Sequence, residues 1–130
     1  MMPLCAAREV AVIPWSPLAR GLLAGTRRSP DDRQATQRAA SDDFARKLYD
    51  QPGDQEVIDA VRRVAQARGV PPARIALAWL LSKPAVTAPI IGATKVEHLD
   101  DAIAALAVEL SSDEIRQLEA PYRPHAMRGF

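Results

Sequence analysis

The chain has 130 residues, of which 48% are apolar and 25% are charged, and its 17 basic and 16 acidic side chains leave a net charge of +1. This composition argues against wholesale disorder, and the apolar runs are far shorter than the roughly 18 residues that a membrane-spanning helix needs. The balanced charge gives no electrostatic case for binding nucleic acid or a membrane surface. The length also excludes a complete (β/α)8 barrel, because each of eight units would have about half of the roughly 30 residues that a βα repeat needs.

The first eight residues predict the end of a helix and no export signal. They lack a basic region followed by a long apolar core, which a signal peptide would require. Cys5 is the single cysteine, so an internal disulfide is excluded and a reducing compartment is favoured. We therefore expect a cytoplasmic protein.

Residues 9–15 predict a strand, because this short run is apolar and rich in β-branched residues. Its lack of polar alternation is typical of a strand buried on both faces, as in a parallel sheet. A turn or loop follows at 16–21. The next clear periodicity comes only after a long loop at about 22–54, in which residues 43–49 are compatible with a short helix, and a connection of this length is usually a functional lid or a mobile segment.

The second half of the chain predicts four helices and one more strand. Apolar residues at helical spacing from Gln55 predict a helix that Gly69 ends, and Pro72 suits the start of a buried helix that reaches about Ser82. Residues 86–91 form the second predicted strand, followed by a helix from about residue 96. Ser111 and Glu114 have the spacing of a capping box for a last helix that ends near residue 119.

This order is an α/β alternation with two strands of the buried type. Such strands expose faces and edges that need further strands beside them. The residues alone therefore predict one part of a larger parallel sheet.

Two loops that follow these strands carry the candidate binding residues. Gly92, Thr94 and Lys95 precede a helix, where unpaired N–H groups, a hydroxyl and a positive charge suit a phosphate, although such residues also serve ordinary turns and caps. After the first strand, Trp15 could stack on a planar ring and Arg20 could meet a phosphate, or the two could be a packed Trp and a solvated Arg.

Four motifs together resemble the C-terminal part of an aldo-keto reductase. They are VAVIPWSPLARG at 10–21, IALAWLL at 75–81, PIIGATK at 89–95 and HLDDA at 98–102. The ending EAPYRPH at 119–125 is similar to the YajO-like bacterial branch of that family. The resemblance covers essentially the whole chain and implies the C-terminal portion of a (β/α)8 TIM barrel, with about two βα units, C-terminal helices and a tail.

The resemblance also implies a cofactor, NADP(H), and a reaction that moves a hydride to or from an aldehyde or ketone. Trp15 matches the aromatic residue that stacks on the nicotinamide. Ala102 matches a position that often holds Asn, so one expected hydrogen bond is absent. The remaining matches are Ser16, Leu18 and Arg20 for the pyrophosphate, Gly92, Thr94 and Lys95 for the 2′-phosphate, His98 for the adenosine end, and Asp101 for the adenine.

No catalytic residue is assigned within the chain. The family's catalytic Asp, Tyr, Lys and His lie on earlier barrel strands, upstream of the segment that matches Met1, and neither Tyr49 nor Tyr122 can take the role of the general acid. We therefore expect residues 1–130 to be an incomplete barrel domain: a truncated product, a misplaced start or a fragment. A metal site is not expected, because His98 and His125 are far apart and Cys5 completes no ligand set.

Three functions remain open at this point. In the first, the chain is the cofactor-binding part of an NADP-dependent oxidoreductase that needs an upstream barrel segment. In the second, it is a non-catalytic module that binds the phosphate end of NADP. In the third alternative it is a structural remnant that oligomerises through exposed sheet edges.

Overall fold

The computed structural model describes residues 1–26, 48, 49 and 51–124. The predicted short helix at 43–49 lies outside this part except for its last two residues, as does the end of the tail at 125–130. No described helix is both long and apolar enough to cross a membrane. The helical elements are α1 (Met2–Ala7), the 3-10 turn η1 (Ala19–Gly21), α3 (Asp54–Arg68), α4 (Pro72–Leu81), α5 (Val96–Ala104), the 3-10 turn η3 (Ala105–Ala107) and α6 (Ser112–Glu119).

The ends of three helices follow the predicted signals. Gly69 adopts the left-handed conformation (φ 65°) after α3, which a residue without a side chain reaches at little cost. Pro72 occupies the first turn of α4, where its missing N–H would have had no partner. At α6 the capping box is complete, since the Glu114 N–H donates to Ser111 Oγ at 3.2 Å and the Ser111 N–H donates to Glu114 Oε2 at 2.7 Å.

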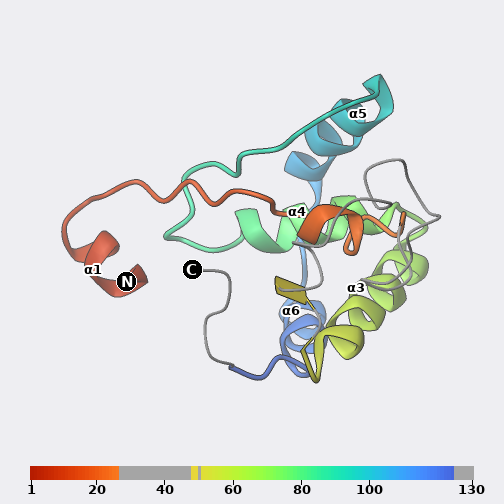
Figure 1. Ribbon diagram of the computed structural model, residues 1–130, viewed down its shortest axis with the longest axis horizontal. Coiled ribbons are helices and arrows are strands. Elements are labelled where there is room, and N and C mark those ends of the chain that lie inside the picture. Colours follow the sequence, from red (N-terminus) through yellow and green to blue (C-terminus); the bar gives the residue numbers. More distant parts are fainter. Residues whose placement is uncertain (27–47, 50, 125–130) are drawn as a thin grey trace.

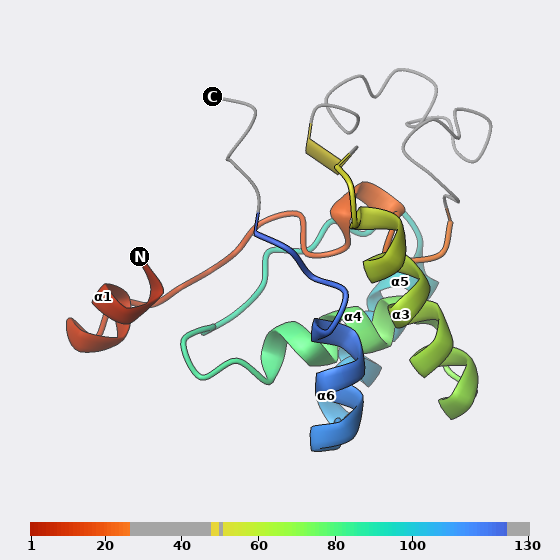
Figure 2. The same ribbon diagram turned by 90° about the horizontal axis from the view of Figure 1, so that it is seen from below.

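Helices α3, α4 and α6 pack into a helical body that contains the hydrophobic core (Figures 1 and 2). Ile75 of α4 is fully buried, and Val61 and Val64 of α3 and Leu118 of α6 pack in the same cluster. The predicted burial of the second helix is therefore confirmed. Helix α5 contacts α4 and continues into η3, which also contacts α4.

A charged clamp fastens α6 to α3. Arg68 donates from Nε to Glu114 Oε1 at 2.5 Å and from Nη2 to Glu114 Oε2 at 2.7 Å, and Nη2 also reaches the carbonyl oxygen of Glu109 at 2.7 Å. Together with the N–H of Ser111, this guanidinium lowers the pKa of Glu114 to about 2. Two-point Arg–carboxylate pairs are among the stronger polar contacts.

A second polar cluster joins α4 to α6. Glu119 accepts a hydrogen bond from Trp79 Nε1 at 3.0 Å and another from Lys83 Nζ. Lys83 also lies 4.6 Å from the centroid of the Trp79 ring, within range of a cation–π contact. These two donors, Lys83 first, lower the pKa of the Glu119 carboxyl.

The two predicted strands lie side by side and parallel, but they do not form continuous strands. Isolated bridges join Val12 to Val86 and Trp15 to Ile90, and the N–H groups of Thr87 and Ile90 donate to the carbonyl oxygens of Val12 and Pro14 at 2.8 Å each. The prediction of continuous strands at 9–15 and 86–91 is therefore wrong. Within the described residues, the regular elements are all helical. Pro14 and Pro89 have no N–H to give to a ladder, so pairing stops at separate bridges.

The predicted burial of these segments on both faces is also wrong. Exposure alternates along residues 11–15, with Val12 half-buried while Ile13 and Trp15 are 56% and 58% exposed. On the second segment Ile90 is 53% exposed. Alternation with period two is typical of extended backbone, and the outward apolar side chains are exposed because no described segment covers that face. Both views show α1 at the far end of these segments from the helical body (Figures 1 and 2).

Candidate functional site

The candidate site is formed by the two loops that leave the carboxyl ends of the parallel segments. The bridge between Trp15 and Ile90 sets these ends side by side, so that residues 16–21 and residues 92–95 emerge at the same edge. In parallel α/β folds this edge is where ligands bind. The two loops that the sequence analysis singled out separately therefore start side by side.

The loop at 16–21 has an unusual backbone. Ser16, Ala19 and Arg20 have φ values of 53°, 47° and 55°, in the left-handed region that side chains disfavour. Such strain persists only where the surroundings hold it, and here Leu22 is buried to 1% exposure while Leu18 packs against the core. The carbonyl oxygen of Leu18 also accepts from the N–H of Gly21 at 3.0 Å. The loop is therefore held in a fixed shape by the helical body.

The loop at 92–95 offers free backbone donors in front of a helix. Within the part of the chain that the structure describes, none of the N–H groups of residues 92–95 donates a hydrogen bond. Gly92 lies in open space, with no atom within 4 Å of a Cβ built on it. Lys95 is the extended N-cap of α5 (φ −140°), and both it and Thr94 are exposed. Unpaired N–H groups, a helix N-terminus and a cation together can bind an anion.

These residues fit a dinucleotide in most respects. Trp15 is 58% exposed at the edge where the two loops begin, so its side chain is accessible to a planar ring. Free N–H groups and the side chains of Thr94 and Lys95 suit phosphate oxygens. Ser16, Leu18 and Arg20 belong to the fixed loop, and Arg20 already has interactions within the protein.

Two residues predicted at the adenosine end lie on α5. His98 is exposed in the first turn of α5. Asp101 lies in the second turn and accepts a hydrogen bond from Arg74 Nε of α4 at 2.8 Å. Sequence reasoning missed Arg74, although it is the one charged residue in α4 and an isolated charge on an apolar helix is a signal.

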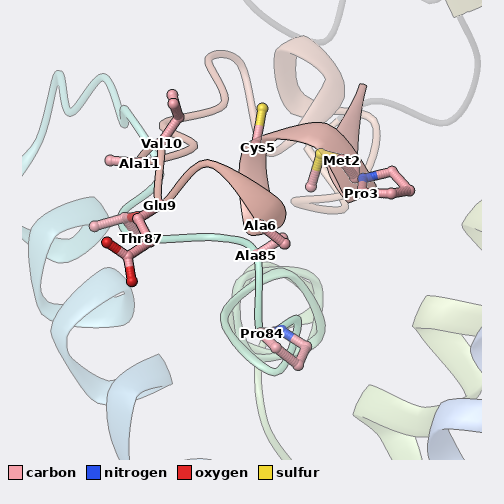
Figure 3. A pocket seen from close by; sticks show the side chains of 10 residues that line it. All are labelled: Met2, Pro3, Cys5, Ala6, Glu9, Val10, Ala11, Pro84, Ala85 and Thr87. Atoms are coloured by element: carbon pink, nitrogen blue, oxygen red, sulfur yellow. The ribbon is translucent and has the colours of Figure 1, made fainter.

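A hollow of about 600 Å3 lies away from the two loops (Figure 3). Met2, Cys5 and Val10 line it from the α1 side, and Pro84 and Thr87 line it from the second parallel segment. It is therefore at the amino ends of the segments, opposite to the edge where parallel folds place their sites. Its volume alone does not make it a better candidate than the edge where the two loops begin.

Within residues 1–26, 48, 49 and 51–124, no three His, Cys, Asp or Glu side chains are grouped as metal ligands would be.

Comparison with known proteins decides the family. The sequence model of the aldo/keto reductase family matches residues 1–123. The chain belongs to the aldo-keto reductase family. Members of this family are (β/α)8 barrels, so the parallel pairing of the two segments and the loops at their carboxyl ends agree with that architecture.

Relatives in fungi show similarity along nearly the whole chain. A putative aryl-alcohol dehydrogenase of Schizosaccharomyces pombe is 41% identical over 99% of this chain and 35% of its own length. The aldo-keto reductase AFTS1 of Alternaria alternata is 40% identical over 99% of the chain and 34% of its own length. The versiconal hemiacetal acetate reductase of Aspergillus parasiticus is 36% identical over 98% of the chain and 36% of its own length.

The chain thus spans about a third of the length of the curated relatives it matches. Its relationship to aldo-keto reductases is confirmed. The narrower assignment to the YajO-like bacterial branch stays a prediction.

Proposed function

We propose that residues 1–130 are the cofactor-holding C-terminal part of an NADP(H)-dependent aldo-keto reductase barrel in the cytoplasm. One observation carries the proposal: the Trp15–Ile90 bridge places the strained loop at 16–21 and the free N–H groups at 92–95 at one edge. Bound NADP(H) would supply or accept the hydride. The chain's own contribution is to bind and orient that cofactor.

Each loop has a separate task in this proposal. Trp15 stacks on the nicotinamide, and Ser16, Leu18 and Arg20 hold the pyrophosphate. Gly92, Thr94 and Lys95 bind the 2′-phosphate at the N-terminus of α5, with His98 at the adenosine. The free N–H groups and the ammonium of Lys95 can donate charge-assisted hydrogen bonds to a 2′-phosphate. NAD(H) has no phosphate at that position and would not form these bonds. This set therefore favours NADP(H) over NAD(H).

Reduction of a carbonyl also needs a proton donor, and the described loops contain none of the right kind. Tyr122 follows α6 and is not part of either loop. We propose that the catalytic Asp, Tyr, Lys and His belong to the part of the barrel that corresponds to the rest of the relatives' length. Aldehydes, ketones or the matching alcohols are the proposed substrates, in line with the names of the relatives.

Calorimetric titration of the whole 130-residue chain with NADP+ and with NAD+ tests the proposal. We expect NADP+ to bind more tightly, with a Kd below about 1 mM. Lys95→Ala should weaken NADP+ binding about tenfold while leaving NAD+ binding within about twofold, because the ammonium acts on the 2′-phosphate.

Arg116→Ala is the matched control, since it removes an exposed cation on α6, far along the chain from both loops. Equal binding of the two nucleotides, or equal losses in the Lys95 and Arg116 variants, would contradict the proposal.

Self-association through the parallel segments is a second candidate function. The observation that favours it is the exposure of Ile13, Trp15 and Ile90 on segments that have unpaired backbone groups along their edges. Exposed strand edges with apolar side chains readily pair with further strands. Light scattering over a concentration series tests it: a growing mean mass supports association, and a constant monomer mass contradicts it.

A further inference from the structure

Helix α5 carries an exposed stripe of apolar side chains, here called the α5 stripe. Its members recur at intervals of three and four residues, so they lie on one side of the helix. They are between 47% and 72% exposed and comprise Val96, Leu99, Ile103 and Leu106, the last of these in the 3-10 turn η3 that continues α5. Large apolar side chains that gather on one exposed face are typical of a surface that binds another protein chain.

The rest of the protein contacts the opposite side of α5. Ala105 of η3 is 1% exposed, and Asp101 of α5 pairs with Arg74 of α4. These two positions lie nearly half a turn away from the α5 stripe. Along one border, the stripe lines an open hollow of about 210 Å3 with Leu77 and Leu81 of α4 on its far side. Figure 1 shows α5 on the other side of α4 from α3 and α6, so neither of those helices covers the stripe.

The order of side chains in the α5 stripe favours pairing with a parallel copy of the same helix. Val96 and Ile103 are seven residues apart, and Leu99 and Leu106 repeat that interval three residues later. In two-stranded parallel coiled coils, β-branched residues favour the first of these positions and leucine favours the second. Two such repeats are too short to form a helix pair from unfolded peptides, but α5 is already formed and contacts α4, so pairing has no cost of helix nucleation.

Two charges on the borders of the α5 stripe select the same arrangement. Lys95 lies on one border and Asp100 on the other, both are exposed, and neither side chain has a hydrogen bond or ion pair within the described residues. In a parallel pair, the residue before the first apolar position of one helix lies beside the residue five places later on the other helix. Lys95 of each copy would therefore meet Asp100 of the other, twice across the two-fold axis. An antiparallel pair would set alanines, Ala102 and Ala107, opposite these charges.

We propose that the α5 stripe is the seam of a parallel homodimer in which two copies of the 130-residue chain pair through α5. The inference goes beyond the proposed function and does not depend on cofactor binding. It also uses a different surface from the parallel segments. Because four apolar side chains per copy are far fewer than the roughly 20–30 residues a side of a standard interface, the dimer is weak, with a Kd on the order of 100 μM.

Sedimentation equilibrium of the whole chain over a concentration series, without nucleotide, measures the dimer. Ile103→Lys places a charge in the middle of the seam and should weaken the dimer at least about tenfold. Leu4→Lys makes the same kind of change at an exposed apolar residue of α1, so it is the matched control and should leave the Kd within about twofold. Circular dichroism confirms that both variants keep their helices.

Charge reversal tests the parallel register. Lys95→Glu and Asp100→Lys each set like charges opposite one another, and each should weaken the dimer about fivefold. The double variant Lys95→Glu/Asp100→Lys exchanges the two charges and should restore the Kd to within about twofold of the unaltered chain. Two weakened single variants without recovery in the double variant would contradict this pairing.

A disulfide probe tests the same geometry. In a Cys5→Ser background, Leu99→Cys sets the two thiols beside each other across the two-fold axis, so oxidised glutathione should link the copies. Glu97→Cys is the control, because Glu97 is exposed on the same helix but lies outside the stripe. It should form at least about tenfold less covalent dimer, since its thiols cannot approach to bonding distance across the seam.

Three results would overturn the inference. The first is a constant monomer mass at all concentrations. The second is an association that Ile103→Lys leaves undiminished, which places the contact on the parallel segments or on another surface. The third is preferential linking of a mixture of Val96→Cys and Leu106→Cys chains, which indicates an antiparallel pair. Titration with NADP+ is a separate measurement, so each of these results leaves the proposed function intact.

Discussion

The helical body and the parallel segments of this chain treat their apolar side chains in opposite ways. In the body, Ile75 of α4 is fully buried in a cluster with residues of α3 and α6. On the parallel segments, Ile13 and Ile90 have similar apolar side chains that are 56% and 53% exposed. Polar contacts follow the same division, because the Arg68–Glu114 clamp and the Glu119 cluster both join helices of the body.

This contrast shows which parts of the chain supply their own partners. The helices bury their apolar faces against one another, so the body has the contacts of a folded core. Within the described residues the parallel segments pair only with each other and leave apolar side chains exposed, as two segments of a larger parallel sheet would. The candidate site lies where the two regions meet, since its first loop is anchored in the body and begins at a parallel segment.

The largest expected effect comes from truncating the same residue type in both regions. Ile75→Ala should lower the free energy of unfolding by about 2–5 kcal/mol, because it leaves a cavity in a packed core. Ile90→Ala should lower it by less than about 1 kcal/mol, since half of that side chain already contacts water. Urea denaturation of both variants measures the difference, and similar losses would show that the two regions are equally packed.

The charged clamp should make the body sensitive to acid. Glu114→Gln should destabilise the chain by about 1–2 kcal/mol at pH 7, because a neutral amide oxygen accepts weaker hydrogen bonds from Arg68 and from the N–H of Ser111 than a carboxylate does. The folded pKa of Glu114, about 2, is below its ordinary value of 4.5. Its contribution is therefore complete above pH 4.5 and is lost as the pH falls toward 2.

Denaturation between pH 2 and pH 7 tests this dependence. The difference between the unaltered chain and Glu114→Gln should shrink as the pH falls through that window. Asp113→Asn, at the exposed pair with Arg116, is the control and should change stability by less than about 0.5 kcal/mol. A constant difference across the window would show that the clamp does not act through the ionised carboxylate.

The strained loop should respond to a glycine in the opposite direction from a helix. Ala19→Gly should raise stability by about 0.5–1 kcal/mol, because glycine adopts the positive φ of that position without strain. It should also weaken NADP+ binding a few-fold, since the loop loses its fixed shape. Ala104→Gly in α5, where φ is −63°, should instead lower stability by up to about 1 kcal/mol. Thermal unfolding and calorimetry measure both, and a loss of stability in Ala19→Gly would mean that the loop is unstrained.

The smallest effect on stability is expected on the exposed face of the parallel segments. Ile13→Lys should change the free energy of unfolding by less than about 0.5 kcal/mol, because the side chain already points into water. It should nevertheless reduce any self-association, since a lysine on an exposed strand edge opposes pairing. Light scattering of this variant beside the unaltered chain provides the measurement, and undiminished association would place the contact on another surface.

The helices could be predicted from the sequence because their signals are local. Gly69, Pro72 and the Ser111–Glu114 spacing each act within one turn, and each marks a helix end in the structure. The sequence locates the two parallel segments correctly, but it predicts continuous strands that are buried on both faces. Both properties depend on neighbours and on the N–H groups that Pro14 and Pro89 lack, so the apolar run alone could not determine them.

The candidate site was predictable in its loops but not in its contacts. The residues at 92–95 and Trp15 are selected by their positions after the two segments, since parallel folds place both loops at one edge, and their role in binding stays a prediction. The partner of Asp101 could not be found in this way, because Arg74 is 27 positions away in the chain and meets it only when α4 packs beside α5. The strain at Ser16 and Ala19 likewise depends on how Leu18 and Leu22 are anchored.

Nuclear magnetic resonance of the 15N-labelled chain titrated with NADP+ tests the central claim most directly. We predict that the amide signals of residues 16–21 and 92–96 shift together with one saturation curve, while those of α3 and α6 stay in place. NAD+ should shift the second loop less, because it lacks the 2′-phosphate. Shifts confined to the hollow beside α1, or two loops that saturate independently, would contradict the account of one cofactor site at the carboxyl edge.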